Sequence, residues 1–242
     1  MTSEKNDVTE TVLSIRKELK KFSTPESKKS FQRFFKNPVL RHGVRSADVL
    51  KVGKVGFSDS RNLSKKQIYE VCEELFKSGY CEESWVAANW AYWFATYEEA
   101  DFKVFERWID KYIDNWAECD TFCNHAVGAF IEKFPKHIAG LKTWAKSRNL
   151  WLRRAAAVSL IVPAKKGKYL KDAFEISDIL LEDKEDMVQK GYGWLLKEES
   201  RQHRDEVLKY VLKNKKKMPR TSLRYAIELM PQSLRKKAMN RE

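Results

Sequence analysis

A tryptophan and a carboxylate four residues apart, Trp116 and Asp120, are the residues whose types and spacing best suit chemistry. Four residues are just over one helical turn, so in a helix both side chains lie on one face. The functional interpretation is a catalytic carboxylate beside an aromatic wall. The structural alternative places Trp116 in the core, and Asp120 at the surface near the positive N-terminus of a helix that Asn115 caps.

A second aromatic candidate is Trp194, which lies in the stretch KGYGWLLKE. Gly191 and Gly193 precede it, and a glycine inside a helix costs roughly 1 kcal/mol relative to alanine. Two tolerated glycines indicate that another group packs very close to this helix. Two interpretations remain open for these glycines: tight packing between two helices, or close approach of a bound substrate.

The remaining motifs exclude several kinds of site. Cys119, Cys123 and His125 cluster near Asp120, but no second ligand pair at zinc spacing follows, so we expect buried free thiols and no metal. The chain has no GxxxxGK[ST], GxGxxG, GxSxG or HExxH pattern. We therefore expect no cofactor.

The composition points to a polyanionic partner. The chain has 242 residues and a net charge of +13, with the excess spread along the whole sequence. The four cysteines form no CxxC pair, which favours a reducing, cytoplasmic compartment. The first ten residues are polar and show no signal peptide. No apolar run approaches the roughly 20 residues of a membrane span, so no membrane partner is expected.

Apolar residues recur at spacings of three and four along nearly the whole chain, which predicts an all-α protein. We expect a single domain over residues 1–242, with residues 1–6 disordered. Thr24-Pro25 and Ser64 mark helix starts, and Gly79 marks a helix end. The expected helices span residues 8–22, 25–36, 46–56, 65–78, 83–95, 98–113, 116–133, 135–146, 149–162, 169–182, 184–198, 203–213 and 221–230, with a short one after Pro231.

Four of these helices can be laid over one another. The segments begin at Thr121, Trp151, Met187 and Thr221, with offsets of 30, 36 and 34 residues. A period in the thirties with two helices per unit is typical of an α-solenoid. The fourth positions of the last three segments are Arg154, Lys190 and Arg224.

Equivalent positions in stacked repeats fall in a row on one face. Three cations in such a row predict contacts to a nucleic-acid backbone. The alternative is a set of solvated surface charges.

Taken together, these motifs resemble the AlkD-like DNA alkylation repair glycosylases. The resemblance covers roughly residues 30–235 and depends on the Trp-x-x-x-Asp pair, WLRRAA, GYGWLLKE and the closing MPRTSLRYAIE, in that order. It implies HEAT-like helix pairs that form a curved superhelix with a basic concave cleft. It also implies a monomer that binds duplex DNA and hydrolyses the N-glycosidic bond of N3-methyladenine and N7-methylguanine.

The resemblance assigns a role to each matching residue. It implies that Asp120 is the catalytic carboxylate, that Trp116 and Trp194 contact the lesion nucleotide, and that Arg154 holds the DNA backbone. One position departs from the family pattern: Ala117 stands where an acidic residue is common, and Glu118 follows it. The family pattern also includes an aromatic residue near the N-terminal helices, for which Phe34 and Phe35 are the candidates.

These residue types suit the implied chemistry. An N3- or N7-alkylated purine is already cationic and leaves without protonation, so positive charge develops on the sugar. A carboxylate stabilises that charge and orients water, and indole faces favour the cationic nucleotide. Two other functions remain open: a DNA-binding module without catalysis, and a helical-repeat scaffold for an acidic protein.

Overall fold

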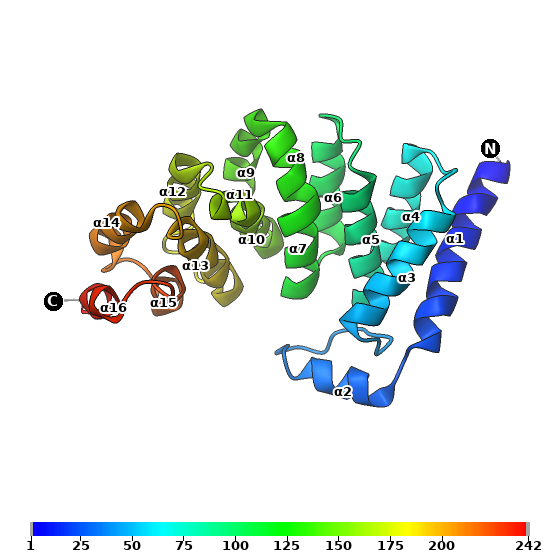
Figure 1. The fold of residues 1–242 in the computed structure, drawn as a ribbon, viewed down its shortest axis with the longest axis horizontal. Helices are drawn as coiled ribbons and strands as arrows, with labels where there is room; N and C mark the ends of the chain where they lie inside the picture. The colour runs from blue at the N-terminus through cyan, green and yellow to red at the C-terminus, as the bar shows by residue number, and fades with distance from the viewer. Residues whose placement is uncertain (1, 241–242) are drawn as a thin grey trace. The chain divides into compact units, whose positions relative to one another are not determined.

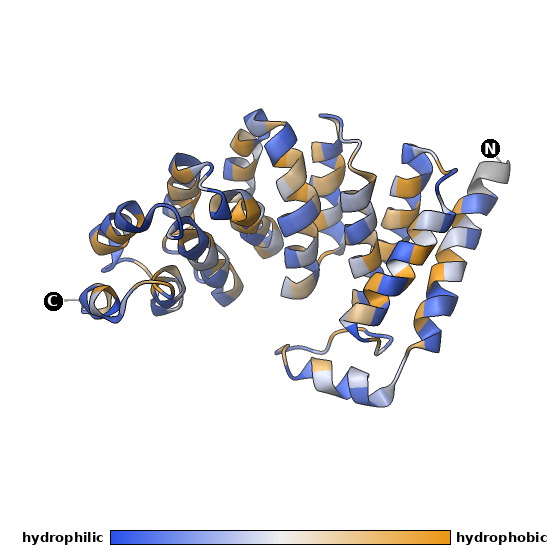
Figure 2. Ribbon diagram, in the orientation of Figure 1, coloured by the Kyte–Doolittle hydropathy of each residue, from blue (hydrophilic) through white to orange (hydrophobic). Residues whose placement is uncertain are grey.

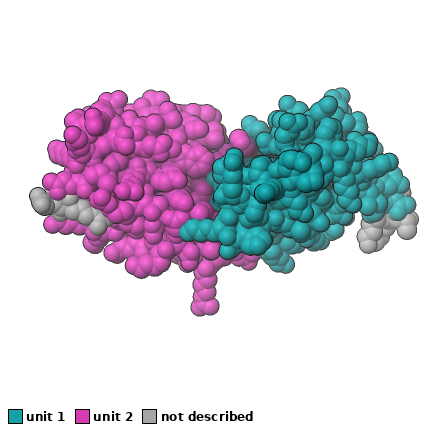
Figure 3. Space-filling model, turned by 90° about the horizontal axis from the view of Figure 1, so that it is seen from below, with its two compact units in different colours: residues 1–98, 111–122 teal, residues 99–110, 123–242 magenta. Residues whose placement is uncertain are grey.

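The computed structural model describes residues 2–240, and no strand occurs among them. The all-α prediction is therefore confirmed for the described residues. They divide into two compact units, which Figure 3 shows in different colours. Unit 1 contains the described residues up to Glu98 together with Lys111–Phe122, and unit 2 contains Glu99–Asp110 and the described residues from Cys123 onward. The single domain expected from sequence stays a prediction.

Unit 1 consists of five N-terminal helices and one later helix, which Figure 1 labels. Most of them carry hydrophobic and hydrophilic residues side by side along their length, as Figure 2 shows. Residues 2–6, expected to be disordered, form the start of the first helix, and Met1 lies outside the described residues. The helices are α1 (Thr2–Lys21), α2 (Pro25–Gln32), α3 (Ser46–Asp59), α4 (Lys65–Lys77), α5 (Cys81–Phe94) and α7 (Trp116–Phe122).

The helix starts of unit 1 follow the predicted caps. The Thr24 hydroxyl accepts a hydrogen bond from the Ser27 amide, and Pro25 is the first helical residue of α2. Ser64 and Gln67 form a reciprocal capping box at the start of α4. After α4 the chain turns at Gly79, whose φ of 70° favours glycine.

The predicted end of α3 near Gly53 and Gly56 is wrong, because the helix continues to Asp59. Both glycines face large side chains of unit 1. A Cβ on Gly56 would lie 3.2 Å from the Trp90 indole, and the Trp90 Nε1 donates to the Gly53 carbonyl at 2.9 Å. The glycines thus allow α3 to approach α5 closely, and they do not terminate the helix.

Unit 2 contains shorter helices. Residues 116–133, expected as one helix, form α7, a π-helical turn at Cys123–Val127 and α8 (Gly128–Lys133). The predicted helix over 149–162 breaks at Ser159, because Pro163 lacks an amide hydrogen and its ring would clash with the Ser159 carbonyl. The other helices are α6 (Asp101–Tyr112, whose last two residues belong to unit 1), a 3-10 turn (Pro135–His137), α9 (Ile138–Trp144), α10 (Leu150–Val158), α11 (Ile161–Lys165), α12 (Leu170–Ile179), α13 (Asp186–Glu199), α14 (Arg204–Asn214), α15 (Arg220–Ala226) and α16 (Gln232–Met239).

Helices α10, α13 and α15 form a parallel stack within unit 2. Between α10 and α13, the hydrogen bond from Arg154 to the Met187 carbonyl is followed by contact of Val158 with Gly191. From α13 to α15, the Thr221–Asp186 hydrogen bond is followed by close packing of Gly193 against Tyr225. In each pair of helices, the residue numbers of both contact partners increase in the same direction, so the helices are parallel. This is the packing that the repeat overlay predicts.

Small residues set the spacing in this stack. A Cβ on Gly193 would lie 2.7 Å from the Tyr225 Cβ and 2.8 Å from the Ser222 carbonyl oxygen. One on Gly191 would lie 3.4 Å from the Arg154 Cγ. The close approach predicted for these glycines is confirmed, and it is helix–helix packing. The α-solenoid type of fold follows from this stack, whereas the curved superhelix and its concave cleft remain predictions.

The backbone contact at Gly193 leads to the first testable prediction. Gly193→Ala should lower the free energy of unfolding by about 2–3 kcal/mol, because the backbone and Tyr225 Cβ of α15 cannot move aside locally. Denaturant unfolding measures the change. Gly53→Ala is the matched control, since its Cβ would meet only ordinary contacts, the nearest at 3.5 Å. It should raise stability by about 0.5–1 kcal/mol through helix propensity. Equal effects of the two substitutions would contradict this account.

Candidate functional site

Asn115 positions the start of α7 and thereby Trp116 and Asp120. The Asn115 side-chain oxygen accepts hydrogen bonds from the amides of Ala117 and Glu118, each at 3.1 Å. Asn115 is therefore the predicted N-cap and Trp116 is the first helical residue. Trp116 and Asp120 follow one turn apart on α7, and both side chains are half-buried.

Trp116 belongs to an aromatic cluster within unit 1. The ring of Phe35 stacks on Trp116 with centroids 5.2 Å apart and planes 17° from parallel. Phe31 contacts both Phe35 at 4.9 Å and Trp85 at 5.4 Å. Of the two N-terminal candidates, the structure thus places Phe35 against Trp116, whereas Phe34 is 57% exposed. The stack fixes one face of the Trp116 indole.

Helix α7 also contributes to a small hollow of unit 1. Thr121, the residue after Asp120, lines a cavity of about 350 Å³ with Trp85, Asn89 and Leu50. The buried Trp85 Nε1 has no hydrogen-bond partner within the described residues.

A second carboxyl group of α7, Glu118, lies in a different environment. It is 2% exposed, and burial together with the negative charge of Asp114 raises its pKa to about 8. A hydrogen bond from the Asn115 side chain acts in the opposite direction. Glu118 is therefore mainly protonated at neutral pH. No sequence signal marks Glu118, because its burial depends on contacts with other helices.

The three predicted phosphate contacts lie on the parallel stack of unit 2. Arg154, Lys190 and Arg224 are each the fifth residue of their helix, α10, α13 and α15. Their surroundings differ. Arg154 is 4% exposed and its guanidinium donates to the Met187 carbonyl. Lys190 forms an ion pair with Asp186 at 2.8 Å, and Arg224 is exposed at a hollow that Tyr225 and Arg235 also line.

Trp194 lies on α13 with a half-buried ring. Its indole Nε1 donates to the Glu198 carboxylate at 3.1 Å, and Arg201 donates to the same carboxylate. Arg201 thereby holds the pKa of Glu198 below its usual range against the effect of burial. The ring edge of Trp194 is thus oriented by a charged pair, a common way to position a functional aromatic.

The candidate residues fall into two groups. Trp116 and Asp120 belong to unit 1, and Trp194, Arg154 and the two other cations belong to unit 2. All four cysteines are buried, and none of them forms a disulfide. Within residues 2–240 no group of three or more potential ligands is placed to hold a metal ion. No described helix is long and apolar enough to cross a bilayer.

Comparison with known proteins gives a family match and several similar solved structures, two of which are described below. Residues 15–230 match the family model described as DNA alkylation repair enzyme. A predicted DNA alkylation repair enzyme from Enterococcus faecalis has a similar fold, with a TM-score of 0.78 and 15% identity over 87% of this chain and 97% of the other. No protein of curated function matches the sequence.

The second similar structure is the alkylpurine DNA glycosylase AlkC of Pseudomonas fluorescens, bound to DNA containing an abasic site analog. Its TM-score is 0.57 and its identity 14%, over 99% of this chain and 66% of that one. At this identity the two likenesses show the fold.

The raised pKa of Glu118 leads to a prediction about stability and pH. The folded state keeps a proton that the unfolded state releases between pH 4.5 and about 8, so this group makes wild-type stability fall over that range. Glu118→Gln should therefore become progressively more stable than wild type, by about 2–4 kcal/mol at pH 8 relative to pH 4.5. Urea unfolding at several pH values measures the difference.

Glu10→Gln, at an exposed position of α1, is the control. Its free energy of unfolding should depend on pH in the same way as that of wild type. A pH-independent difference between Glu118→Gln and wild type would contradict the assignment.

Proposed function

This chain belongs to the DNA alkylation repair enzyme family, and we propose that within it the protein is an AlkD-like DNA glycosylase. Its reaction is hydrolysis of the N-glycosidic bond of cationic alkylpurines, N3-methyladenine and N7-methylguanine, in duplex DNA. The observation that carries the proposal is the pairing, on one helix of a repair-family chain, of the half-buried Asp120 with the stacked Trp116.

Asp120 acts as the catalytic carboxylate in this proposal. The base leaves as a neutral purine because it already carries the positive charge, so no general acid is needed. As the bond breaks, the sugar becomes oxocarbenium-like. The Asp120 carboxylate stabilises that charge and orients the attacking water. Glu118, mainly protonated and buried, adds no negative charge to the site at neutral pH.

The two tryptophans bind the lesion nucleotide. An indole face attracts a cation by about 0.5–2 kcal/mol, so a cationic base gains more from these rings than a neutral one. Phe35 covers one face of Trp116 and leaves the nucleotide the rest of the indole. Trp194 is oriented by its hydrogen bond to Glu198. Selectivity for alkylated purines then follows from charge.

Arg154, Lys190 and Arg224 bind the DNA backbone in this proposal. Arg224 is exposed and ready for a phosphate, and Lys190 exchanges one anion, Asp186, for another. Arg154 has to exchange its bond to the Met187 carbonyl for one to a phosphate oxygen. The similar AlkC structure, which contains DNA, supports a DNA partner. We further propose that the protein acts as a monomer.

Two other functions make different predictions. A DNA-binding module without catalysis would bind methylated duplex DNA and release no base. A helical-repeat scaffold for an acidic protein would show no affinity for duplex DNA at about 50 mM salt, where counterion release makes DNA binding strong. The burial of Arg154 is the observation that favours a structural role. Analysis of released bases separates all three functions.

The role of Asp120 is tested by Asp120→Asn. The variant should release 7-methylguanine from methylated duplex DNA about 100-fold or more slowly, because a charge that stabilises the transition state is lost. Its affinity for DNA should stay within about twofold of wild type, since the amide keeps the shape of the side chain. Asp59→Asn, an exposed carboxyl at the end of α3, is the control and should keep full activity. Wild-type release by Asp120→Asn would refute the assignment.

The role of Trp194 is tested by Trp194→Ala and Trp194→Phe. Loss of the indole should lower single-turnover release of 7-methylguanine about 3- to 30-fold, the range of one cation–π contact. The phenylalanine variant should recover part of the rate, because its ring also attracts cations. The melting temperature is measured in parallel. A large fall in melting temperature with an unchanged rate would show that Trp194 is a core residue only.

A further inference from the structure

Helix α2 and the loop that follows it form an element of unit 1 that buries almost nothing. None of the eight residues of α2 is buried. We call Pro25–Val39 the α2 arm. In Figure 1 the helix lies beyond the ends of α1 and α3. A short isolated helix is unstable in water, so one that contributes no buried residue needs other contacts to hold it and a reason to be displayed.

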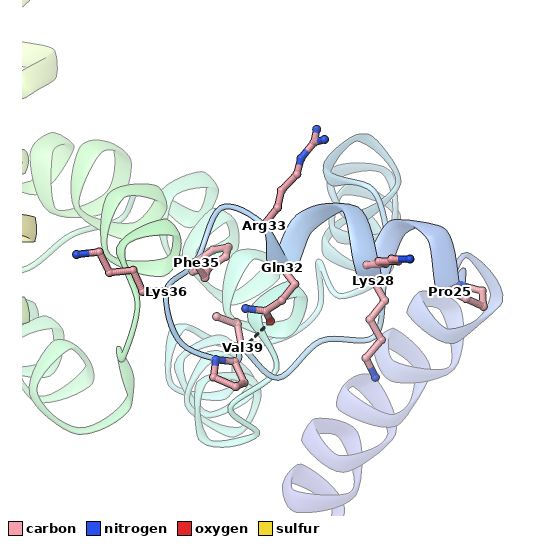
Figure 4. Close-up of a pocket in the computed structure, with 9 residues that line it drawn as sticks. Pro25, Lys28, Gln32, Arg33, Phe35, Lys36 and Val39 are labelled. Carbon is pink, nitrogen blue, oxygen red and sulfur yellow. Dashed lines mark hydrogen bonds between the residues drawn. The ribbon is translucent and has the colours of Figure 1, made fainter.

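The arm is held firmly at its ends. At the start, the Thr24 amide donates to the Gly43 carbonyl at 2.9 Å. Gln32 closes the loop after the helix: its Nε2 donates to the Asn37 carbonyl and its Oε1 accepts from the Val39 amide. Figure 4 shows this second bond. Phe35 anchors the loop on Trp116. The arm is therefore a fixed surface with its helix exposed.

One face of the arm concentrates positive charge. A hollow of about 730 Å³ is lined by four cations and no acidic residue. Figure 4 shows the lining side chains. No ion pair neutralises any of the four within the described residues, although most lysines of unit 1 helix α4 are paired. The cations are Lys28, Lys29, Arg33 and Lys36.

The opposite face of α2 provides a comparison within the same element. Its hollow, of about 590 Å³, has two cations and two acids, Lys21, Arg45, Glu26 and Asp48. Arg45 and Asp48 pair there at 3.3 Å. Positive charge without an acidic residue beside it is thus confined to one side of the arm, so a polyanion would bind on that side.

The geometry points to the phosphate backbone of duplex DNA as the occupant of this hollow. We propose that the α2 arm is a DNA-contact surface separate from the three cations of unit 2, and that Lys28, Lys29 and Lys36 each bind a phosphate. Lysine stems of this length reach successive phosphates, and the contacts are independent of sequence. The exposed Phe34, with the Arg33 guanidinium 4.9 Å from its ring centre, adds an aromatic group next to the backbone.

An anionic membrane surface fits the arm less well. A helix that lies on a bilayer needs a broad apolar face. The one aromatic residue of α2, Phe31, packs inward between Trp85 and the Arg41 guanidinium, which lies 3.5 Å from its ring centre. The helix therefore offers lipid no apolar face.

The arm also bears on the proposed reaction. Phe35 links the arm to Trp116, so a strand bound by the arm is held at a fixed place relative to that indole. This step rests on the proposed function, whereas DNA binding by the arm does not. The arm should accordingly affect how much DNA is bound and leave the rate of bond cleavage in the bound complex unchanged.

The binding test compares two triple variants of the full chain that change net charge equally. The arm variant is Lys28→Gln/Lys29→Gln/Lys36→Gln, and the control is Lys17→Gln/Lys20→Gln/Lys54→Gln on α1 and α3, all at exposed positions. Fluorescence anisotropy with an undamaged labelled duplex gives Kd at several salt concentrations. The slope of log K against log salt should fall in magnitude by about 2–3 in the arm variant, and Kd near 100 mM salt should rise about tenfold.

Each outcome decides the proposal. An arm variant with the wild-type salt slope would overturn it, and so would equal losses in both variants, which would indicate a diffuse electrostatic field. Phosphatidylserine vesicles are the second probe. Vesicle binding that the arm variant loses while it keeps DNA affinity would overturn it in favour of a membrane partner. A specific loss of DNA affinity supports it.

Base release is measured in a separate assay, so failure of the proposed glycosylase function can be distinguished from failure of the arm proposal. The wild-type chain could bind DNA and release no base, while the arm variant specifically loses DNA affinity. That result would support the arm proposal and refute the glycosylase function. Where release occurs, the arm variant should raise the half-saturating concentration and keep the maximal single-turnover rate. A lower maximal rate with unchanged half-saturation would contradict the linkage to Trp116.

Discussion

The buried carboxylate of Glu82 is the constraint on which the candidate site of unit 1 depends. It accepts hydrogen bonds from the amides of His42, Gly43 and Val44 and from the side chain of Arg41. A buried charge is tolerated only when it is paired and fully hydrogen-bonded, so these four consecutive residues have little freedom. Arg41 then places its guanidinium on Phe31, which contacts Phe35, which stacks on Trp116. A single anion thus supports, through Arg41 and Phe31, the ring that covers one face of the proposed lesion-binding indole.

Unit 2 depends on a different constraint, the distance between parallel helices. Glycine at positions 191 and 193 brings α13 close to α10 and α15, and interiors are packed too densely for an added methyl group to be absorbed. The consequence for function is the burial of Arg154, which the close approach holds against the Met187 carbonyl. The same packing that aligns the three cations as equivalent residues therefore makes them unequal in accessibility.

The helix boundaries show which local signals are reliable. Thr24, Ser64 and Asn115 cap helices as predicted, because a cap acts through bonds to amides only three residues away. Gly53 and Gly56 do not end a helix, and both contact Trp90 of another helix, which no local pattern predicts. The break at Ser159 has a local cause, Pro163, and could have been predicted. The π-helical turn at Cys123–Val127 has no local signal in the sequence.

The sequence by itself determined the all-α class, the repeat of about 30 to 36 residues and the pairing of Trp116 with Asp120, because helical periodicity and caps act over a few residues. It also offered two neighbouring phenylalanines, Phe34 and Phe35, for the N-terminal aromatic of the family pattern. Only the tertiary structure shows that Phe35 stacks on Trp116, that burial raises the pKa of Glu118, and that Arg154 is shielded while the cations of the α2 arm have no ion pair. Burial and charge pairing depend on residues far apart in the chain, which no local pattern encodes.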